Sequence, residues 1–194
     1  MQRPVPRIAL FARYPRPGAA KTRLIPALGA EGAAALHRRL VERTLATIGA
    51  SGLPFAVWIT GGSRAECADW LGEAVPLAEQ GEGDLGARLA RVPAPAILLG
   101  ADVPDLAPAH LLAAADALDS APVAIGPAAD GGYYLLAFRT PAPFLFDAMP
   151  WGTDAVLAET QARLAARGIA PVMLPELADC DRPEDLSRWP ELAR

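Results

Sequence analysis

The sequence predicts an α/β protein of three layers, in which helices cover both faces of a mostly parallel sheet. Short apolar segments alternate along the chain with longer segments of helical periodicity, and 52% of the 194 residues are hydrophobic. Strands separated by helices are typical of parallel sheets, because each parallel connection needs a crossover. No apolar run approaches the ~18 residues that would span a bilayer. At this length we expect one domain, residues 1–194.

Six short apolar segments are predicted to be strands. They are residues 8–12, 55–60, 96–99, 122–125, 133–138 and 171–174. The segments 122–125 and 133–138 flank Asp130-Gly131-Gly132, which is a hairpin signal. We therefore expect one antiparallel element in an otherwise parallel sheet.

Helices are predicted between these strands, at residues 31–48, 64–71, 84–92, 108–118 and 154–167. The first has apolar residues at three-, four- and seven-residue steps, from Leu36 to Ile48, and charged residues on its other face. Side chains that accept hydrogen bonds from a helix N-terminus precede several helices. We expect Asp84, Asp105, Thr153 and Asp181 to act as N-caps.

The charge distribution is uneven. Lys21 is the only lysine beside seventeen arginines, and residues 1–30 hold six basic residues and no acid, although the net charge is −4. The acidic remainder argues against nucleic acid as a partner. Cys67 and Cys180 lie far apart, so we expect reduced thiols rather than a disulfide. No signal-peptide core follows the N-terminus, which predicts a cytoplasmic protein.

Ligands of open α/β sheets bind outside the carboxyl ends of the strands, so the loops after the strands are the candidate sites. The loop of residues 13–23 combines a Pro-Gly turn at Gly18 with the cations Arg13, Lys21 and Arg23. A compact lysine charge beside a glycine suits phosphate. A solvated basic face is the alternative reading. The loop lacks the glycine spacing of a Walker A motif.

Carboxylates follow two further strands. Asp102 follows strand 96–99, where a hard divalent cation could bind, and Asp130 begins the Asp-Gly-Gly turn. The run from Gly81 to Gly86 spells G-x-G-x-x-G, but Glu82 and Asp84 would repel a pyrophosphate, so we prefer a tight turn there. Asp130 could instead serve only the turn.

The ordered set of motifs is more specific than any one of them. It comprises Phe11-Ala12-Arg13, Pro15-Arg16-Pro17-Gly18, Lys21-Thr22-Arg23-Leu24, Gln80, Asp84-Leu85-Gly86-Ala87-Arg88, Gly100-Ala101-Asp102-Val103-Pro104, Gly126-Pro127-Ala128, Asp130-Gly131-Gly132-Tyr133-Tyr134, Trp151-Gly152-Thr153 and residues 179–186. This set resembles the small bacterial GT-A-type glycosyltransferase-like family, some of whose members are labelled arsenosugar-biosynthesis glycosyltransferases. That family is similar to 2-phospholactate guanylyltransferase and molybdopterin-guanine dinucleotide synthase.

The resemblance implies the nucleotide-diphospho-sugar transferase (GT-A, Rossmann-like) fold and a nucleotide substrate. It implies that Asp102 binds Mg²⁺ or Mn²⁺ and that Lys21 and Arg23 contact phosphates. Gln80 and Gly86 would contact the base or ribose. Two departures are Arg13, where lysine is more usual, and Arg182, where threonine often follows the aspartate. The second weakens the metal role of Asp181.

We expect a metal-dependent transferase, with glycosyl transfer from a nucleotide-diphosphate sugar to a small acceptor as the leading hypothesis. Asp130 would be a second metal ligand or the base that deprotonates the acceptor. The expected site residues are Asp102, Lys21 and Asp130 for catalysis, Arg13, Gly18, Arg23, Gln80 and Gly86 for the nucleotide, Gly131, Gly132, Tyr133 and Trp151 for substrate, and Asp181 as a further metal ligand.

Two other functions remain open. A nucleotidyltransferase would use the same cations to hold a nucleoside triphosphate, and a non-catalytic module would bind nucleotide without turnover. An exposed face around Trp189 could serve a homodimer.

Overall fold

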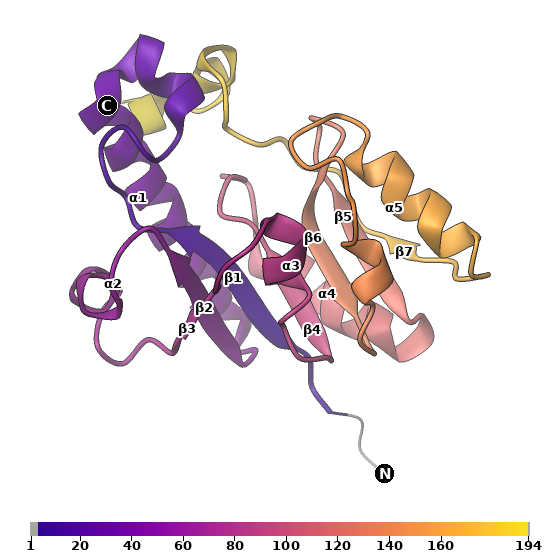
Figure 1. Ribbon diagram of the computed structural model, residues 1–194. Coiled ribbons are helices and arrows are strands. Elements are labelled where there is room, and N and C mark those ends of the chain that lie inside the picture. The colour runs from indigo at the N-terminus through magenta and orange to yellow at the C-terminus, as the bar shows by residue number, and fades with distance from the viewer. Residues whose placement is uncertain (1–3, 194) are drawn as a thin grey trace.

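The computed structural model, which describes residues 4–193, contains one seven-stranded sheet of order β3-β2-β1-β4-β6-β5-β7 (Figure 1). The strands are β1 (Arg7–Arg13), β2 (Phe55–Thr60), β3 (Leu77–Glu79), β4 (Ala96–Leu99), β5 (Val123–Pro127), β6 (Tyr133–Phe138) and β7 (Val172–Met173). Neighbouring strands are parallel except at β6, which runs antiparallel to β4 and β5. This confirms the mostly parallel sheet with one antiparallel element.

The helices between the strands are α1 (Ile25–Ser51), α2 (Arg64–Leu71), α3 (Leu85–Leu89), α4 (Pro108–Ser120) and α5 (Val156–Ala165). Short 3-10 helices are η1 (Thr22–Leu24), η2 (Pro143–Leu145), η3 (Pro183–Arg188) and η4 (Pro190–Ala193). No described helix is long and apolar enough to cross a membrane. The sequence did not predict β3, because a three-residue strand with no buried residue lacks a periodic apolar pattern.

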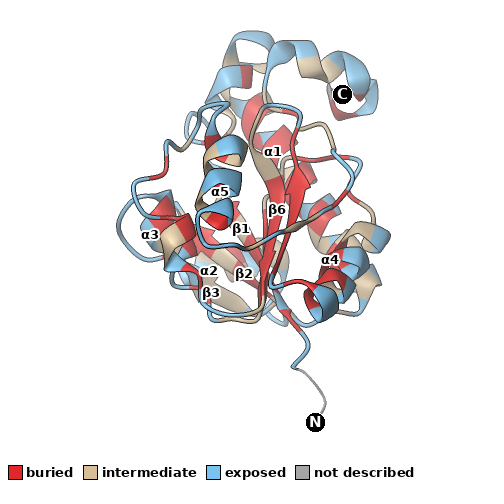
Figure 2. Ribbon diagram, turned by 90° about the vertical axis from the view of Figure 1, so that its right-hand side faces the viewer, coloured by how far each residue is buried: buried red, intermediate tan, exposed pale blue. Residues whose placement is uncertain are grey.

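The sheet is the middle of three layers. On one face, α1, α2 and α4 bury side chains such as Val41, Cys67 and Leu111 against the sheet. On the other face, α3, η2 and α5 contribute Leu89, Leu145 and Leu164 to a second core. Figure 2 shows buried strands between helices whose outer surfaces are exposed. The predicted three-layer architecture is confirmed.

The C-terminal segment folds back over the first half of α1 (Figure 1). Leu24, Leu36 and Cys180 pack there with Trp189, whose residue exposure is only 5%. Trp189 itself therefore lies in this core while its chain neighbours are exposed, and the homodimer stays a prediction. This packing carries residues 179–182 toward the carboxyl end of the sheet, where they meet the loop after β1.

The predicted N-caps had mixed outcomes. Asp84 caps α3 by accepting a hydrogen bond from the Ala87 N–H. Asp105 instead accepts a hydrogen bond from the Trp189 indole N–H. At the start of α4, the His110 ring accepts a hydrogen bond from the Ala107 N–H. Thr153 and Asp181 are not N-caps either, because Ala155 and Arg182 occupy the N-cap positions of α5 and η3. Asp181 is thereby free to form ion pairs.

Candidate active site

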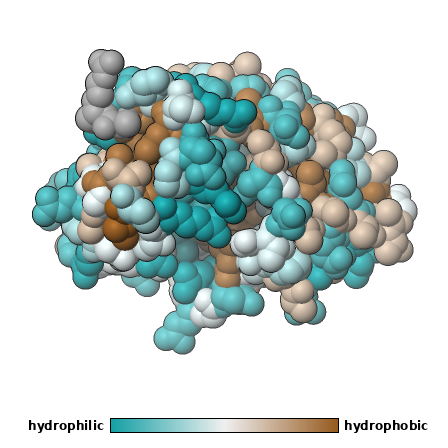
Figure 3. All heavy atoms as spheres, turned by 90° about the horizontal axis from the view of Figure 1, so that it is seen from above, coloured by the Kyte–Doolittle hydropathy of each residue, from teal (hydrophilic) through white to brown (hydrophobic). Residues whose placement is uncertain are grey.

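Four segments meet at the carboxyl end of the sheet. The loop after β1 and the loop after β4 are neighbours because these strands pair directly. The β5–β6 turn lies beside Leu177, since the Ala129 N–H donates to the Leu177 carbonyl. The same C-terminal segment meets the loop after β4, where the Cys180 N–H donates to the Asp102 carbonyl. Viewed from above, hydrophilic side chains gather over the centre of this end (Figure 3).

Lys21 is the innermost charged group of this region, with only 3% of its side chain exposed. Its ammonium nitrogen lies 2.7 Å from an oxygen of Asp102, 3.3 Å from an oxygen of Asp181 and 2.7 Å from the Cys180 carbonyl oxygen. These three acceptors match the three N–H donors of an ammonium. The structure therefore places Lys21 against two carboxylates, and the phosphate contact that the resemblance implied stays a prediction.

The pKa values of this cluster show how strongly the charges interact. Burial alone lowers the pKa of Lys21, but the charges of Asp102 and Asp181 outweigh it, so the Lys21 pKa lies above its ordinary value. Burial raises the pKa of Asp181, yet Lys21 and Arg23 reverse that effect and lower it. Lys21 is therefore held as a cation and Asp181 as an anion.

The backbone of Lys21 is unusual as well. Its φ and ψ are 48° and 46°, a left-handed conformation just before η1. This conformation costs ~1–2 kcal/mol for a residue with a Cβ, and such strain is often found at functional sites. The three contacts of the ammonium group compensate for it.

Two arginines border this cluster on the solvent side. Arg23 pairs with Asp181 at 2.6 Å, while 55% of its side chain stays exposed. A cavity of about 370 Å³, which we call the cationic cavity, is lined by Arg13, Arg23, Lys21 and His37 together with Asp102 and Asp181. Gly18 has a φ of 79° in the same loop, a conformation that favours glycine.

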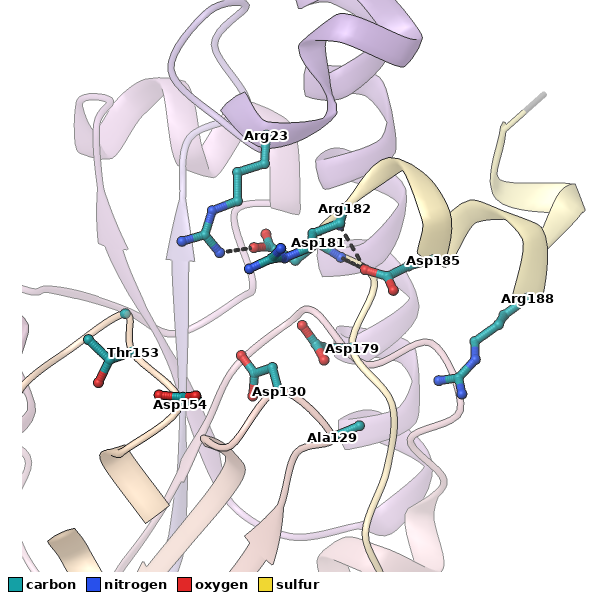
Figure 4. Close-up of a pocket in the computed structure, with 11 residues that line it drawn as sticks. Arg23, Ala129, Asp130, Thr153, Asp154, Asp179, Asp181, Arg182, Asp185 and Arg188 are labelled. Atoms are coloured by element: carbon teal, nitrogen blue, oxygen red, sulfur yellow. Dashed lines mark hydrogen bonds and ion pairs between the residues drawn. The ribbon is translucent and has the colours of Figure 1, made fainter. Parts of the chain in front are cut away.

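Three other cavities adjoin the cationic cavity. The apolar cavity, about 320 Å³, has Phe11, Leu85, Tyr133 and Trp151 among its walls. The acidic cavity, about 170 Å³, brings together Asp102, Asp130, Asp179 and Asp181. The mixed-charge cavity, about 550 Å³, lies between Asp130 and Arg188 (Figure 4). Asp102 borders the cationic, apolar and acidic cavities, and Asp130 borders the apolar, acidic and mixed-charge cavities.

The Asp130 turn is held in place by close packing. An oxygen of Asp130 accepts a hydrogen bond from the Gly132 N–H at 2.9 Å. Gly131 has a φ of 88°, and a Cβ there would lie 2.4 Å from the Asp154 carbonyl oxygen. Gly131, expected to contact substrate, therefore has a packing role that explains it without a ligand. Gly132 and Asp130 both remain on cavity walls.

Asp179 faces Asp130 across the floor of the mixed-charge cavity (Figure 4). Burial raises the pKa of Asp179, and the negative charge of Asp130 raises it further. A cation or a hydrogen-bond donor placed between the two carboxylates would relieve this repulsion.

Carboxylate oxygens are the ligands that Mg²⁺ and Mn²⁺ prefer. Within residues 4–193, no group of three or more His, Cys, Asp or Glu side chains is arranged to hold a metal ion on its own. Mg²⁺ is nevertheless commonly bound through one or two carboxylates, with substrate phosphates and water as the other ligands. Asp102, half exposed, and Asp130 in the acidic cavity fit that kind of site.

Two aromatic rings pack together on the wall of the apolar cavity. The rings of Tyr133 and Trp151 pack edge to face with centroids 6.4 Å apart. Burial raises the pKa of the Tyr133 hydroxyl, so this group stays neutral. The expected substrate residues Tyr133 and Trp151 are therefore brought together on one cavity wall.

Gln80 and Gly86, the expected base or ribose contacts, lie differently. Gln80 is buried, and its amide donates to the carbonyl oxygens of Trp58 and Ala12. It therefore braces the ends of β1 and β2. A Cβ on Gly86 would lie 2.3 Å from the Phe146 carbonyl oxygen, so this glycine permits close packing of α3. Both positions have structural explanations in the fold.

Sequence reasoning missed several residues of the site. Nothing in the sequence pattern singled out His37, yet it borders the cationic cavity, and its Nε2 lies 2.9 Å from the Arg13 carbonyl oxygen. Asp179 and Arg188 line the mixed-charge cavity. The concentration of charge from Asp179 to Arg188 was a signal, but it was interpreted mainly as helix capping.

The protein is a three-layer α/β protein with adjoining cavities, lined by charged and aromatic side chains, at the carboxyl end of its sheet. The model of the DUF2064 family, described as an uncharacterized protein conserved in bacteria, matches residues 44–153. This span exceeds half of the 194 residues, and the chain belongs to this family. No curated protein matches the chain.

Solved structures share the fold. A candidate nucleotide-diphospho-sugar transferase from Desulfovibrio desulfuricans G20 is 30% identical, with a TM-score of 0.84 over 91% of this chain and 82% of that chain. Rv0371c from Mycobacterium tuberculosis H37Rv is 20% identical, with a TM-score of 0.55 over 97% and 98%, and has also been solved with manganese. CMP:2-keto-3-deoxy-manno-octonic acid synthetase, solved with CTP, is 17% identical, with a TM-score of 0.55 over 96% and 98%. The predicted nucleotide-diphospho-sugar transferase fold is thus confirmed.

Proposed function

We propose that this protein is a metal-dependent transferase of a nucleotide-activated substrate, and that it transfers a glycosyl group from a nucleotide-diphosphate sugar to a small acceptor. The observation that carries the proposal is the position of Asp102 and Asp130, which line one acidic cavity between a cationic, an apolar and a mixed-charge cavity. The structural relatives support it, since the one from Desulfovibrio desulfuricans G20 is described as a candidate nucleotide-diphospho-sugar transferase.

Each cavity suits one part of such a reaction. The cationic cavity offers Arg13 and Arg23 to the diphosphate, because guanidinium groups match phosphate oxygens in bidentate geometry. The apolar cavity, with Phe11, Tyr133 and Trp151, suits the flat faces of a base or a sugar ring. The mixed-charge cavity is left for the acceptor.

In this proposal, Asp102 would hold the cation, and Asp130 is kept for the acceptor. A bound divalent cation would offset the negative charge that develops on the leaving diphosphate. Lys21 acts through the carboxylates, because its ammonium fixes Asp102 and Asp181 at 2.7 and 3.3 Å. Arg23, which keeps its exposed side toward the cationic cavity, adds positive charge in a pre-set position.

Asp130 is the proposed base because it borders both the acceptor cavity and the apolar cavity. It would take the proton of an acceptor hydroxyl as the oxygen forms a bond to the anomeric carbon. The bond between that carbon and the diphosphate breaks, and the nucleoside diphosphate leaves with the electron pair.

Nucleotidyl transfer is the second candidate, and the cationic cavity favours it. Arg13, Lys21 and Arg23 bring three cations to this cavity, which suits the longer phosphate chain of a nucleoside triphosphate. A nucleoside triphosphate would use that charge while an acceptor phosphate attacks the α-phosphorus. The released product separates the two reactions, because nucleotidyl transfer yields pyrophosphate and glycosyl transfer yields a nucleoside diphosphate.

Two variants test the proposal against a non-catalytic binding module. Asp102→Ala should abolish turnover while the protein stays folded, and unchanged turnover would end the assignment of Asp102. Asp130→Asn should retain nucleotide binding and lose transfer, since the amide cannot accept the proton. If wild-type protein binds nucleotide but no acceptor from a broad panel reacts, the binding-module reading is correct.

A further inference from the structure

The mixed-charge cavity is lined by charged side chains of both signs. It is lined by Arg23, Ala129, Asp130, Gly152, Thr153, Asp154, Asp179, Asp181, Arg182, Asp185 and Arg188. Figure 4 shows Asp130 and Asp179 facing each other on the floor, while the Arg188 side chain extends from the end of η3 toward Ala129. A neutral apolar ligand would leave all of these charges without partners, so the cavity is suited to a polar molecule.

Several charges of this cavity are already paired within the protein. Asp181 is bound by Lys21 and Arg23. Asp185 accepts hydrogen bonds from the N–H groups of Asp181 and Arg182 at 3.0 and 2.8 Å. These contacts hold η3 against the site, and they leave few charges for a ligand.

The guanidinium groups of Arg182 and Arg188 are the unpaired positive charges. Neither forms an ion pair with any residue in the described range 4–193, and both residues are exposed at the cavity. Asp130 and Asp179, by contrast, also line the acidic cavity, where a cation would compensate their charge. Arginine is the side chain best suited to bind a carboxylate or a phosphate in bidentate geometry.

We infer that the acceptor is a small hydroxylated anion, whose carboxylate or phosphate group binds to one of the two unpaired arginines, Arg182 or Arg188. This inference rests on the proposed function and names the substrate class of the same site. Electrostatic repulsion keeps the anionic group away from the carboxylates of Asp130, Asp154 and Asp179. The uncharged hydroxyl group is then the part of the molecule that lies at Asp130, so the charge pattern sets the orientation needed for proton transfer.

The test measures the melting temperature and the calorimetric affinity of the protein with four small probes. Glycerate and glycerol 3-phosphate carry an anionic group beside hydroxyls, and they separate carboxylate from phosphate recognition. Glycerol is the neutral counterpart, and 2-aminoethanol is a cationic one. A ligand that binds the folded state raises its melting temperature by mass action.

Three variants locate any binding. The double variant Arg182→Gln/Arg188→Gln removes both unpaired cations of the cavity. Both residues are exposed, so the ligand-free melting temperature should not change. Arg13→Gln removes a cation of the neighbouring cationic cavity. Arg43→Gln, on the exposed side of α1, is the matched surface control.

At least one of the two anions should stabilise the wild-type protein more than glycerol and 2-aminoethanol do. The double variant should bind it about 10-fold more weakly or worse, while Arg43→Gln and Arg13→Gln keep it, because charge-assisted hydrogen bonds are lost only in the first. An equal response to neutral and anionic probes would overturn the inference. So would stabilisation by the amine alone, or anion binding that survives the double variant and disappears in Arg13→Gln.

The same measurements distinguish failure of this inference from failure of the proposed function. If nucleotides with Mn²⁺ stabilise the protein but neither anion does, the transferase proposal stands and the inference about the acceptor fails. If an anion binds through Arg182 or Arg188 while no nucleotide binds, the anion site stands and the proposed function fails.

Discussion

The ammonium group of Lys21, the only lysine of the chain, lies 2.7 Å from a carboxylate oxygen of Asp102. This contact joins the loop after β1 to the loop after β4. The same ammonium reaches Asp181 and the Cys180 carbonyl, so it also fixes the C-terminal segment. A compact group with three donors satisfies three acceptors in a space with 3% exposure, whereas a planar guanidinium presents its donors in one fixed fork.

Replacing Lys21 should therefore destabilise the protein. Lys21→Met leaves Asp181 and the Cys180 carbonyl without a buried donor, and Lys21→Arg cannot reproduce the geometry. We expect a loss of about 3 kcal/mol for Lys21→Met, near the lower end for broken buried pairs because Asp102 is half exposed. Urea unfolding measures it. A stability equal to that of the Arg43→Gln control would contradict the role of Lys21 as the link between these segments.

Metal binding and nucleotide binding should depend on each other. Lys21 and Arg23 already balance the charges of Asp102 and Asp181, so a divalent cation finds little net negative charge there until phosphates arrive. We expect Mn²⁺ alone to raise the melting temperature little, and Mn²⁺ to tighten nucleotide binding about 5-fold or more, with the reciprocal effect on the metal. Calorimetry of each ligand with and without the other checks this. Equal nucleotide affinity with and without metal would refute it.

Stability should fall between neutral pH and pH 5 partly through His37. Burial lowers the pKa of His37 below its ordinary 6.5, although its hydrogen bond to the Arg13 carbonyl acts the other way. As the pH falls below 6.5, the unfolded chain therefore binds more protons than the folded chain, and protonation of His37 favours unfolding. His37→Gln should flatten this part of the pH dependence of the free energy of unfolding. If the variant keeps the slope of the wild type, His37 is not its source.

A side chain at position 131, where the protein has Gly131, should destabilise the fold. The φ of 88° at Gly131 disfavours alanine, and a Cβ would lie 2.4 Å from the Asp154 carbonyl oxygen. Gly168 is a matched control, because its φ is 67° and a Cβ there would have no neighbour within 4 Å. We expect Gly168→Ala to cost about 1 kcal/mol and Gly131→Ala about 2–3 kcal/mol, from strain plus steric overlap. Equal losses in thermal unfolding would show that the β5–β6 turn can move away from Asp154.

The central strands could be predicted from the sequence because their burial is continuous. All four residues of β4 are buried, and the predicted range 96–99 agrees with the structure. The range of β6, 133–138, agrees as well. The edge strand β3 has three residues and none of them is buried, so its sequence carries little signal, whereas β7 lies within the predicted range 171–174.

The burial of Lys21 could not be predicted from its local sequence. Its partners Cys180 and Asp181 lie 159 and 160 residues further along the chain, so nothing within the loop indicated that the ammonium would face them. Gln80 illustrates the same limit, because its acceptors belong to β1 and β2 and become neighbours only when the sheet forms. The charged residues were recognised, but the way they pair depends on the tertiary fold.

The central claim, that the protein binds a nucleotide-activated substrate with a divalent cation, is tested most directly by thermal unfolding with nucleoside triphosphates and nucleotide-diphosphate sugars. Each is added with and without Mg²⁺ or Mn²⁺, to wild-type protein and to Asp102→Ala. We predict a metal-dependent rise in melting temperature with one nucleotide-diphosphate sugar, larger than with any triphosphate and lost in Asp102→Ala. A larger rise with a triphosphate would favour nucleotidyl transfer. If no nucleotide raises the melting temperature with either metal, the claim is contradicted.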